Sequence, residues 1–144
     1  MGGVLSLFLA SEFPLNGFIA GGTVLKFKRY FTTNFIVPLV CKIIKISKKK
    51  PPKAYKHIQF YGYPVYPLIA LNEYRKMINM VLPKIKNIKI PGLLIHSYAD
   101  LMSVMDNINM IKQRLTIKKI DTFFVKRAHH NMFDNNPDQN LIFN

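Results

Sequence analysis

The sequence has a single cysteine, Cys41, which excludes an internal disulfide and a metal site built from several cysteines. This scarcity is typical of a reducing compartment, so we expect a cytoplasmic protein. No stretch reaches the roughly 18 uncharged apolar residues that a membrane-spanning helix needs. The start does not predict a secretory signal, because it has no basic region and Glu12 interrupts its apolar run.

Acidic residues are also scarce: 7 Asp and Glu against 21 Lys and Arg give a formal net charge of +14. Such a charge suits nucleic acid or an anionic membrane surface as a partner. The basic residues, however, are mostly lysines set among isoleucine and asparagine, as an AT-rich genome encodes on any solvated surface. We therefore expect no specific nucleic-acid partner, and interpret "KKKPPK" (residues 48–53) as a solvated linker. A small basic protein that binds a membrane surface or nucleic acid is the alternative class.

A segment in the first half, "FIVPLVCKIIKI" (residues 35–46), is strongly apolar but carries Pro38, Lys42 and Lys45. The three residues make it too polar to span a membrane. We expect an amphipathic helix that rests on a membrane surface or closes over an apolar site. Contact with an anionic membrane surface is therefore kept as an alternative to a purely cytoplasmic protein.

The remaining pattern alternates strands and helices in 144 residues, of which 49% are hydrophobic. Val4, Leu5, Phe8 and Leu9 predict a first helix, which Phe13-Pro14 ends. Continuous apolar runs bracketed by turn residues predict buried strands. We expect strands over residues 15–22, 90–97 and 119–126, helices over 71–81 and 105–115, and a short last helix within 136–144. This order indicates an α/β domain with a parallel sheet, and residues 23–68 are expected to be an insertion of short helices.

Two loops at the ends of predicted strands carry candidate catalytic residues. Asp100 follows the strand that ends at Ser97, and His129 and His130 follow the next strand. Because the carboxyl ends of parallel strands meet at one edge, an acid and a histidine there can come together. The carboxylate then fixes the imidazole tautomer, as in a nucleophile–histidine–acid triad. A turn-capping role for Asp100 and a solvated turn for the histidines are the structural alternatives.

The segments "IPGLLIHSYAD" (residues 90–100) and "AHHNMFD" (residues 128–134) resemble the α/β-hydrolase esterases and lipases, in particular monoacylglycerol lipases and bacterial carboxylesterases. The resemblance covers nearly the whole chain and implies that Asp100 is the triad acid. Ala128 occupies the family's small-residue position, which implies that His130 is the triad histidine. Counting back from Asp134 gives His129 as the alternative.

The resemblance also implies a division of the chain. Residues 1–22 and 69–144 correspond to an incomplete hydrolase core, and residues 23–68 to the cap that shapes an acyl-binding pocket. After Asp100 the family often has Val and Pro, whereas this chain has "LMSVM", so the geometry of that turn is left open.

The family's nucleophile is missing. Esterases of this branch have the nucleophile in Gly-x-Ser-Met-Gly-Gly, so Met1-Gly2-Gly3 corresponds to the rear half of the nucleophile elbow. Met1 then stands where the family has an oxyanion donor, but in this sequence it is a free amino terminus and not an amide. No other serine has glycines at the elbow spacing, and we interpret the five serines as surface or capping residues: Ser6, Ser11, Ser47, Ser97 and Ser103. We interpret Cys41 as a small buried hydrophobe.

We expect the C-terminal part of a hydrolase, cut just after the serine. A decayed reading frame is the first explanation and a start assigned too far downstream is the second.

The resemblance therefore implies a truncated carboxylic-ester hydrolase with little or no activity, whose intact ancestor acted on a short acyl or monoacylglycerol ester. It implies no cofactor and no metal. One half of a split hydrolase is a further alternative. The haloperoxidase, dehalogenase and epoxide-hydrolase branches share the acid–histidine layout and stay open.

Overall fold

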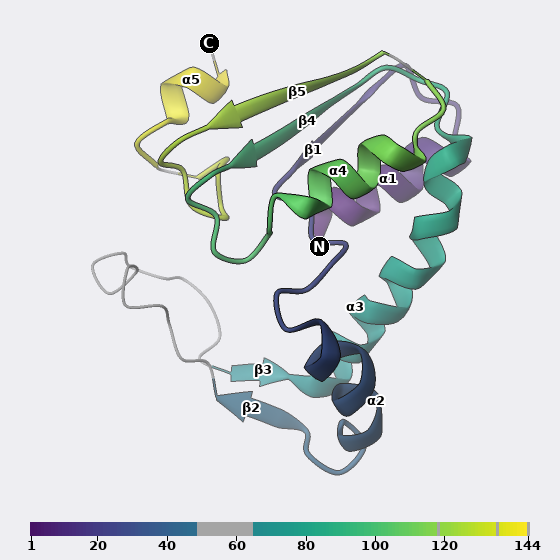
Figure 1. Cartoon of the computed structure of the whole chain (residues 1–144), viewed down its shortest axis with the longest axis vertical. Coiled ribbons are helices and arrows are strands. Elements are labelled where there is room, and N and C mark those ends of the chain that lie inside the picture. Colours follow the sequence, from purple (N-terminus) through teal and green to yellow (C-terminus); the bar gives the residue numbers. More distant parts are fainter. Residues whose placement is uncertain (49–64, 118, 135, 144) are drawn as a thin grey trace. The chain divides into compact units, whose positions relative to one another are not determined.

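The computed structural model of the protein describes residues 1–48, 65–117, 119–134 and 136–143 (Figure 1). The chain divides into two units, Met1–Lys28 with Met77–Asn144 and Arg29–Lys76. Each unit has its own secondary structure and is described by itself below. Residues 49–53 of the predicted lysine-rich linker lie outside the described residues.

The first unit is built on a sheet of three parallel strands, as predicted. β1 (Phe18–Gly21), β4 (Gly92–Ser97) and β5 (Ile120–Val125) lie side by side in the order β1-β4-β5. In the register of the sheet, Ala20 lies beside Leu94, and Leu94 beside Thr122. β4 is buried from Leu94 to Ser97, because it has a neighbour on both sides.

Helices cover this sheet on both sides (Figure 1). α1 (Gly2–Glu12) and α4 (Asp106–Arg114) lie on one side, and the short α5 (Gln139–Phe143) lies on the other. α5 places Ile142 against a buried cluster that contains Ile95, Val125, Ala128 and Met132. α3 (Leu68–Val81) ends before Pro83 and continues as a 3-10 helix, η3 (Leu82–Asn87).

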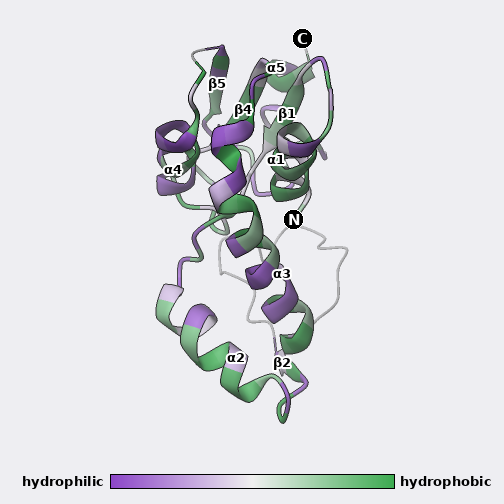
Figure 2. Cartoon of the chain, turned by 90° about the vertical axis from the view of Figure 1, so that its right-hand side faces the viewer, coloured by the Kyte–Doolittle hydropathy of each residue, from purple (hydrophilic) through white to green (hydrophobic). Residues whose placement is uncertain are grey.

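The structure corrects two details of the expected packing. The buried residues of α1 are Val4, Leu7 and Ala10, whereas Leu5 is 46% exposed. Of the four residues whose spacing predicted this helix, Val4 is buried and Leu5 is exposed, because α1 is hydrophobic along most of its length (Figure 2) and its sequence offers more than one apolar face. β1 was expected to be buried, but Ile19 is 59% exposed and lies between the buried Phe18 and Ala20, because successive side chains of a strand alternate between its two faces.

The second unit combines short helices with a small antiparallel sheet. A π-helical turn, η1 (Thr32–Ile36), leads into α2 (Val37–Val40), and β2 (Ile46–Lys48) pairs with β3 (Val65–Pro67). Val37, Cys41 and Leu68 form its buried cluster.

The prediction of one amphipathic helix over residues 35–46 is wrong beyond Val40. The chain turns after Cys41, and Ile46 joins a strand opposite Pro67, because β-branched residues favour the extended backbone once a partner strand is present. Among the helices that the structure describes, none combines the length and the apolar character needed to cross a membrane.

Candidate active site

Asp100 lies just beyond the carboxyl end of β4 and has two roles at once. Its Oδ1 accepts backbone N–H groups from Met102 (2.7 Å) and Ser103 (2.9 Å), which closes the turn that leads to α4. Its Oδ2 points to His130. The turn-capping role that the sequence offered as an alternative therefore coexists with a contact to the histidine.

His130 reaches the acid from the loop after β5. The Nδ1 of His130 lies 2.9 Å from the Oδ2 of Asp100, whose side chain is fully buried, whereas the His130 side chain is 30% exposed. Burial favours the neutral acid, but hydrogen bonds from His130, Ser103 and Met102 outweigh it and hold the pKa of Asp100 below its ordinary value. A carboxylate in this position accepts the proton of Nδ1, which leaves Nε2 as the basic nitrogen of the ring. The structure therefore brings together the acid and the histidine that the sequence singled out.

The histidine loop is held by Asp138, a residue that the sequence analysis did not identify. Its buried carboxylate accepts the backbone N–H groups of Arg127 (2.5 Å) and Ala128 (3.1 Å), just before the two histidines. The Nε of Arg127 adds an ion pair at 3.0 Å. Hydrogen bonds from the backbone of Arg127, which outweigh the effect of burial, keep the pKa of Asp138 below its ordinary value. The sequence did contain a sign of this role, because Asp138 directly precedes the apolar residues of the last helix, and an acidic residue at that position is typical of a helix start.

A further histidine, His96, lies in β4, where it is buried close enough to Asp100 and His130 to interact with their charges. It is 1% exposed, and neither ring nitrogen has a hydrogen-bond partner among the described residues. Burial lowers the pKa of His96, while the charge of Asp100 acts in the opposite direction. Folding therefore favours the neutral form of the His96 ring.

Stability is expected to fall as the pH is lowered below about 6.5, the ordinary pKa of this histidine. Below this pH the unfolded chain binds a proton at His96 more readily than the folded chain does, so protonation favours unfolding. For one such group the free energy of unfolding falls by at most about 1.4 kcal/mol per pH unit. Urea unfolding at pH 7.5, 6.5 and 5.5 measures this slope. His96→Leu is expected to flatten it, and an unchanged slope in that variant would assign the pH dependence to other groups.

A pocket of about 540 Å³ connects His130 with the amino end of α1. It is lined by residues 1–3, Ile19, Gly21, Gly22 and residues 130–134. The predicted elbow remnant, Met1, Gly2 and Gly3, therefore lies around the same pocket as the histidine. Burial lowers the pKa of the Met1 amino group.

Gly3 and Gly2 are expected to respond in opposite ways to the same substitution. A Cβ on Gly3 would lie 2.2 Å from Oγ1 of the buried Thr23 and 3.2 Å from the carbonyl oxygen of Gly21, whereas nothing lies within 4 Å of a Cβ on Gly2. Gly3→Ala should therefore lower the free energy of unfolding by about 1–3 kcal/mol. Gly2→Ala, the matched control, should raise it by about 0.4–1 kcal/mol through the reduced freedom of the unfolded chain. Urea denaturation followed by circular dichroism measures both, and equal effects would contradict the close packing of Gly3.

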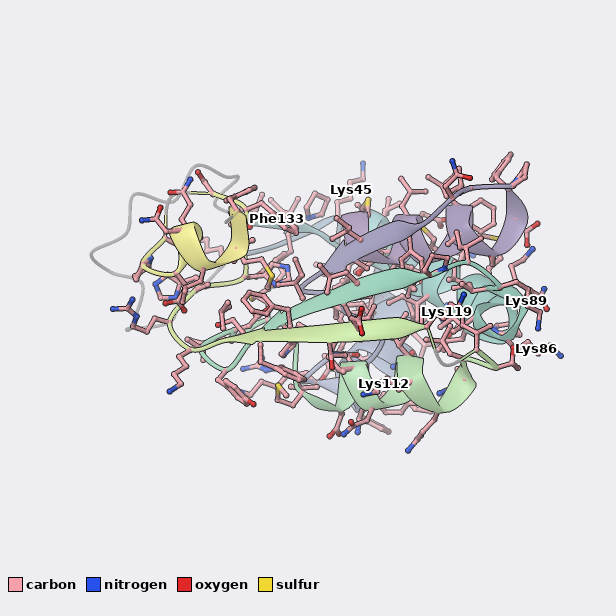
Figure 3. The ribbon with its side chains drawn as sticks, turned by 90° about the horizontal axis from the view of Figure 1, so that it is seen from above. Lys45, Lys86, Lys89, Lys112, Lys119 and Phe133 are labelled. Carbon is pink, nitrogen blue, oxygen red and sulfur yellow. The ribbon has the colours of Figure 1, made fainter. Side chains whose placement is uncertain are left out.

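Figure 3 labels Phe133, which lines this pocket, together with several lysines of the same unit. Phe133, which lines the pocket, lies beside α5 at the carboxyl end of the strands, whereas Lys86, Lys89 and Lys119 lie at the opposite end. The lysines at this end of the strands therefore take no part in lining the pocket.

The described residues contain no group of three His, Cys, Asp or Glu side chains that could hold a metal ion.

Two of the serines interpreted as surface or capping residues are in fact buried. Ser103 is 1% exposed and its Oγ donates to the carbonyl of Thr23 (2.6 Å), while the Oγ of Ser97 accepts the N–H of Ala99 (3.2 Å). Cys41 is buried in the second unit. The two serines therefore stabilise backbone turns by hydrogen bonding, and Cys41 contributes to the packing of the second unit.

The parallel sheet with an acid and a histidine after successive strands defines part of an α/β-hydrolase fold. The chain is similar to a structure from work on two metagenome-derived lipolytic enzymes, LipS and LipT, with a TM-score of 0.80 and 18% identity over 99% of this chain and 58% of that chain. It is also similar to a monoacylglycerol lipase from Paleococcus ferrophilus, with a TM-score of 0.74 and 15% identity over 97% of this chain and 61% of the other. For a soluble variant of monoglyceride lipase from Saccharomyces cerevisiae, the TM-score is 0.72 at 14% identity, over 98% and 58% of the two chains.

The chain spans about 60% of the length of these solved structures, while nearly all of its own residues are matched. No model of a protein family matches the sequence, and no curated protein does. The likeness therefore establishes the fold.

Proposed function

We propose that this chain carries the acid and the histidine of a carboxylic-ester hydrolase, Asp100 and His130, and lacks the nucleophilic serine. The observation that supports this most directly is the 2.9 Å contact between the two side chains beside a pocket at the carboxyl ends of the strands. His130, rather than His129, is the proposed base because it is the histidine that contacts Asp100.

The chemistry follows from the geometry of this pair. In a complete enzyme, a serine hydroxyl attacks the ester carbonyl, and Nε2 of His130 accepts the hydroxyl proton and later donates it to the leaving alcohol. Asp100 holds the proton on Nδ1 and stabilises the imidazolium that forms between the two steps. In a complete enzyme in which the serine precedes Met1, the backbone N–H of Met1, which lines the same pocket, would donate to the oxyanion.

The substrate class is proposed from the neighbours' described activities. They include lipolytic enzymes and monoacylglycerol lipases, so we propose carboxylic esters, including acylglycerols, as the substrates of the complete protein. We also propose that the unit Arg29–Lys76, which overlaps the predicted insertion at residues 23–68, is the cap.

The chain as it stands is expected to hydrolyse p-nitrophenyl butyrate no faster than its His130→Ala variant. Without an activated nucleophile, the acid–histidine pair has no attacking group to deprotonate except water. The release of p-nitrophenol at pH 7.5 measures this, with Asp100→Ala as a second variant. Turnover that disappears in both variants would mean that a nucleophile is present within these residues.

An alternative is that a second polypeptide supplies the serine. This is favoured by the sheet, in which β1 pairs with β4 alone among the described strands and leaves Ile19 exposed. The DNA upstream of the Met1 codon separates the cases. An in-frame strand ending in Gly-x-Ser indicates one continuous enzyme, an out-of-frame one a decayed gene, and a separate gene for this strand a split hydrolase.

A further inference from the structure

Asn107 is a buried amide on α4 whose hydrogen-bonding capacity is fully used. It is 0% exposed. Its Oδ1 accepts the backbone N–H groups of Leu25 (2.9 Å) and Lys26 (2.6 Å), and its Nδ2 donates to Oγ of Ser103 (3.1 Å) and to the carbonyl of Lys26 (3.4 Å). An amide side chain offers two acceptor and two donor positions, and all four have partners here. Because a buried amide left unbonded is costly, these contacts fix its orientation.

Ser103 connects Asn107 to the catalytic acid. Its hydroxyl accepts from Asn107 and donates to the carbonyl of Thr23, and its backbone N–H donates to Oδ1 of Asp100 (2.9 Å). Since Oδ1 is held in this way, the carboxylate presents Oδ2 to His130. The direction of Oδ2 therefore depends on where Asn107 and Thr23 hold Ser103.

The segment that Asn107 binds also reaches His130 from another side. Leu25 and Lys26 follow closely after Gly22, which has a positive φ of 54°. A Cβ on Gly22 would lie 3.3 Å from Nδ1 of His130, so the backbone there packs against the imidazole. By holding Leu25 and Lys26, Asn107 also restrains the nearby backbone of Gly22, which packs against the imidazole of His130.

We propose that Asn107 is a positioning residue that holds both Asp100 and the Gly22 backbone against His130, so that the imidazole carries its proton on Nδ1. The catalytic meaning of this rests on the proposed function. The ion pair between Lys26 and Asp106 (3.0 Å) also joins this segment to α4. It contributes less than Asn107 to holding the segment, because both side chains are exposed and exposed ion pairs add little stability.

The tautomer of His130 tests the proposal in the chain as it stands. Two-bond ¹H–¹⁵N correlation spectra of labelled protein, at a pH where the rings are neutral, distinguish a proton on Nδ1 from one on Nε2, and His130→Gln identifies the signal. We expect the Nδ1–H form in the wild type and its loss in Asn107→Leu, whose side chain is branched at the same carbon, is larger, and can form none of the four hydrogen bonds. Asn109→Leu, at an exposed position of the same helix, is the matched control and should keep the wild-type tautomer.

Milder variants at Ser103 test the same proposal even if the Asn107→Leu protein does not fold. Ser103→Ala removes the hydroxyl link and should reduce the Nδ1–H population, and Ser103→Thr should restore it. Asp100→Asn, in which the amide replaces the charged acceptor, should abolish it and serves as the positive control.

Retention of the wild-type tautomer in folded Asn107→Leu, or in Ser103→Ala if the former does not fold, would overturn the proposal. Equal loss in Asn109→Leu would do the same. The readout needs no ester hydrolysis, so a failure of the proposed function and a failure of this positioning role give different results.

Discussion

Joined to the amino-terminal part of an α/β-hydrolase that ends in Gly-x-Ser, the chain is expected to hydrolyse p-nitrophenyl butyrate, and His130→Ala is expected to lower kcat by about 10⁴-fold. The loss is large because the histidine serves as base in one step and as acid in the next. The contact of His130 with Asp100 is what makes this ring, and no other in the loop, the expected base. Stopped or continuous absorbance assays at saturating substrate measure kcat directly.

His129→Ala is the matched control for this experiment. It removes the adjacent ring from the same loop and should change kcat by less than about 10-fold. If His129→Ala caused the larger loss, the alternative triad histidine implied by the spacing to Asp134 would be the correct one. If neither variant lost activity, the acid–histidine pair would have no catalytic role.

Leu7→Ala is expected to lower the free energy of unfolding by about 2–5 kcal/mol, because it removes a fully buried leucine and leaves a cavity between α1 and its neighbours. Leu5→Ala, in the same helix but at a 46% exposed position, should cost about 1 kcal/mol or less. Urea denaturation of the two variants compares the sides of one helix directly. A larger effect at Leu5 would contradict the packing of α1 through Leu7.

The strands and the catalytic pair could be predicted because their signals are local. The run from Gly92 to Ile95 is apolar without interruption and is preceded by Pro91, so it predicts a buried strand whatever surrounds it. Once the strands are parallel, Asp100 and His130 follow at the same edge, and the structure brings them to 2.9 Å.

The parts that could not be predicted depend on partners far along the chain. Asn107 binds Leu25, which precedes it by 82 residues, and nothing in "DNIN" distinguishes a buried clamp from an exposed asparagine. Ile46 belongs to a strand only because Pro67 lies opposite, so a helical spacing over residues 35–46 was misleading. The face of α1 was likewise decided by the sheet it packs on, since its own sequence is apolar on several sides.

The position of Asp138 along the chain has a consequence for the order of synthesis. A chain leaves the ribosome amino end first, and its early elements can pair before later ones exist. All three strands precede residue 126, whereas the carboxylate that holds the backbone of Arg127 and Ala128 arrives only at residue 138. A nascent chain interrupted in between contains β1, β4 and β5 but lacks the carboxylate that holds the histidine loop, so the acid–histidine pair is fixed later than these three strands.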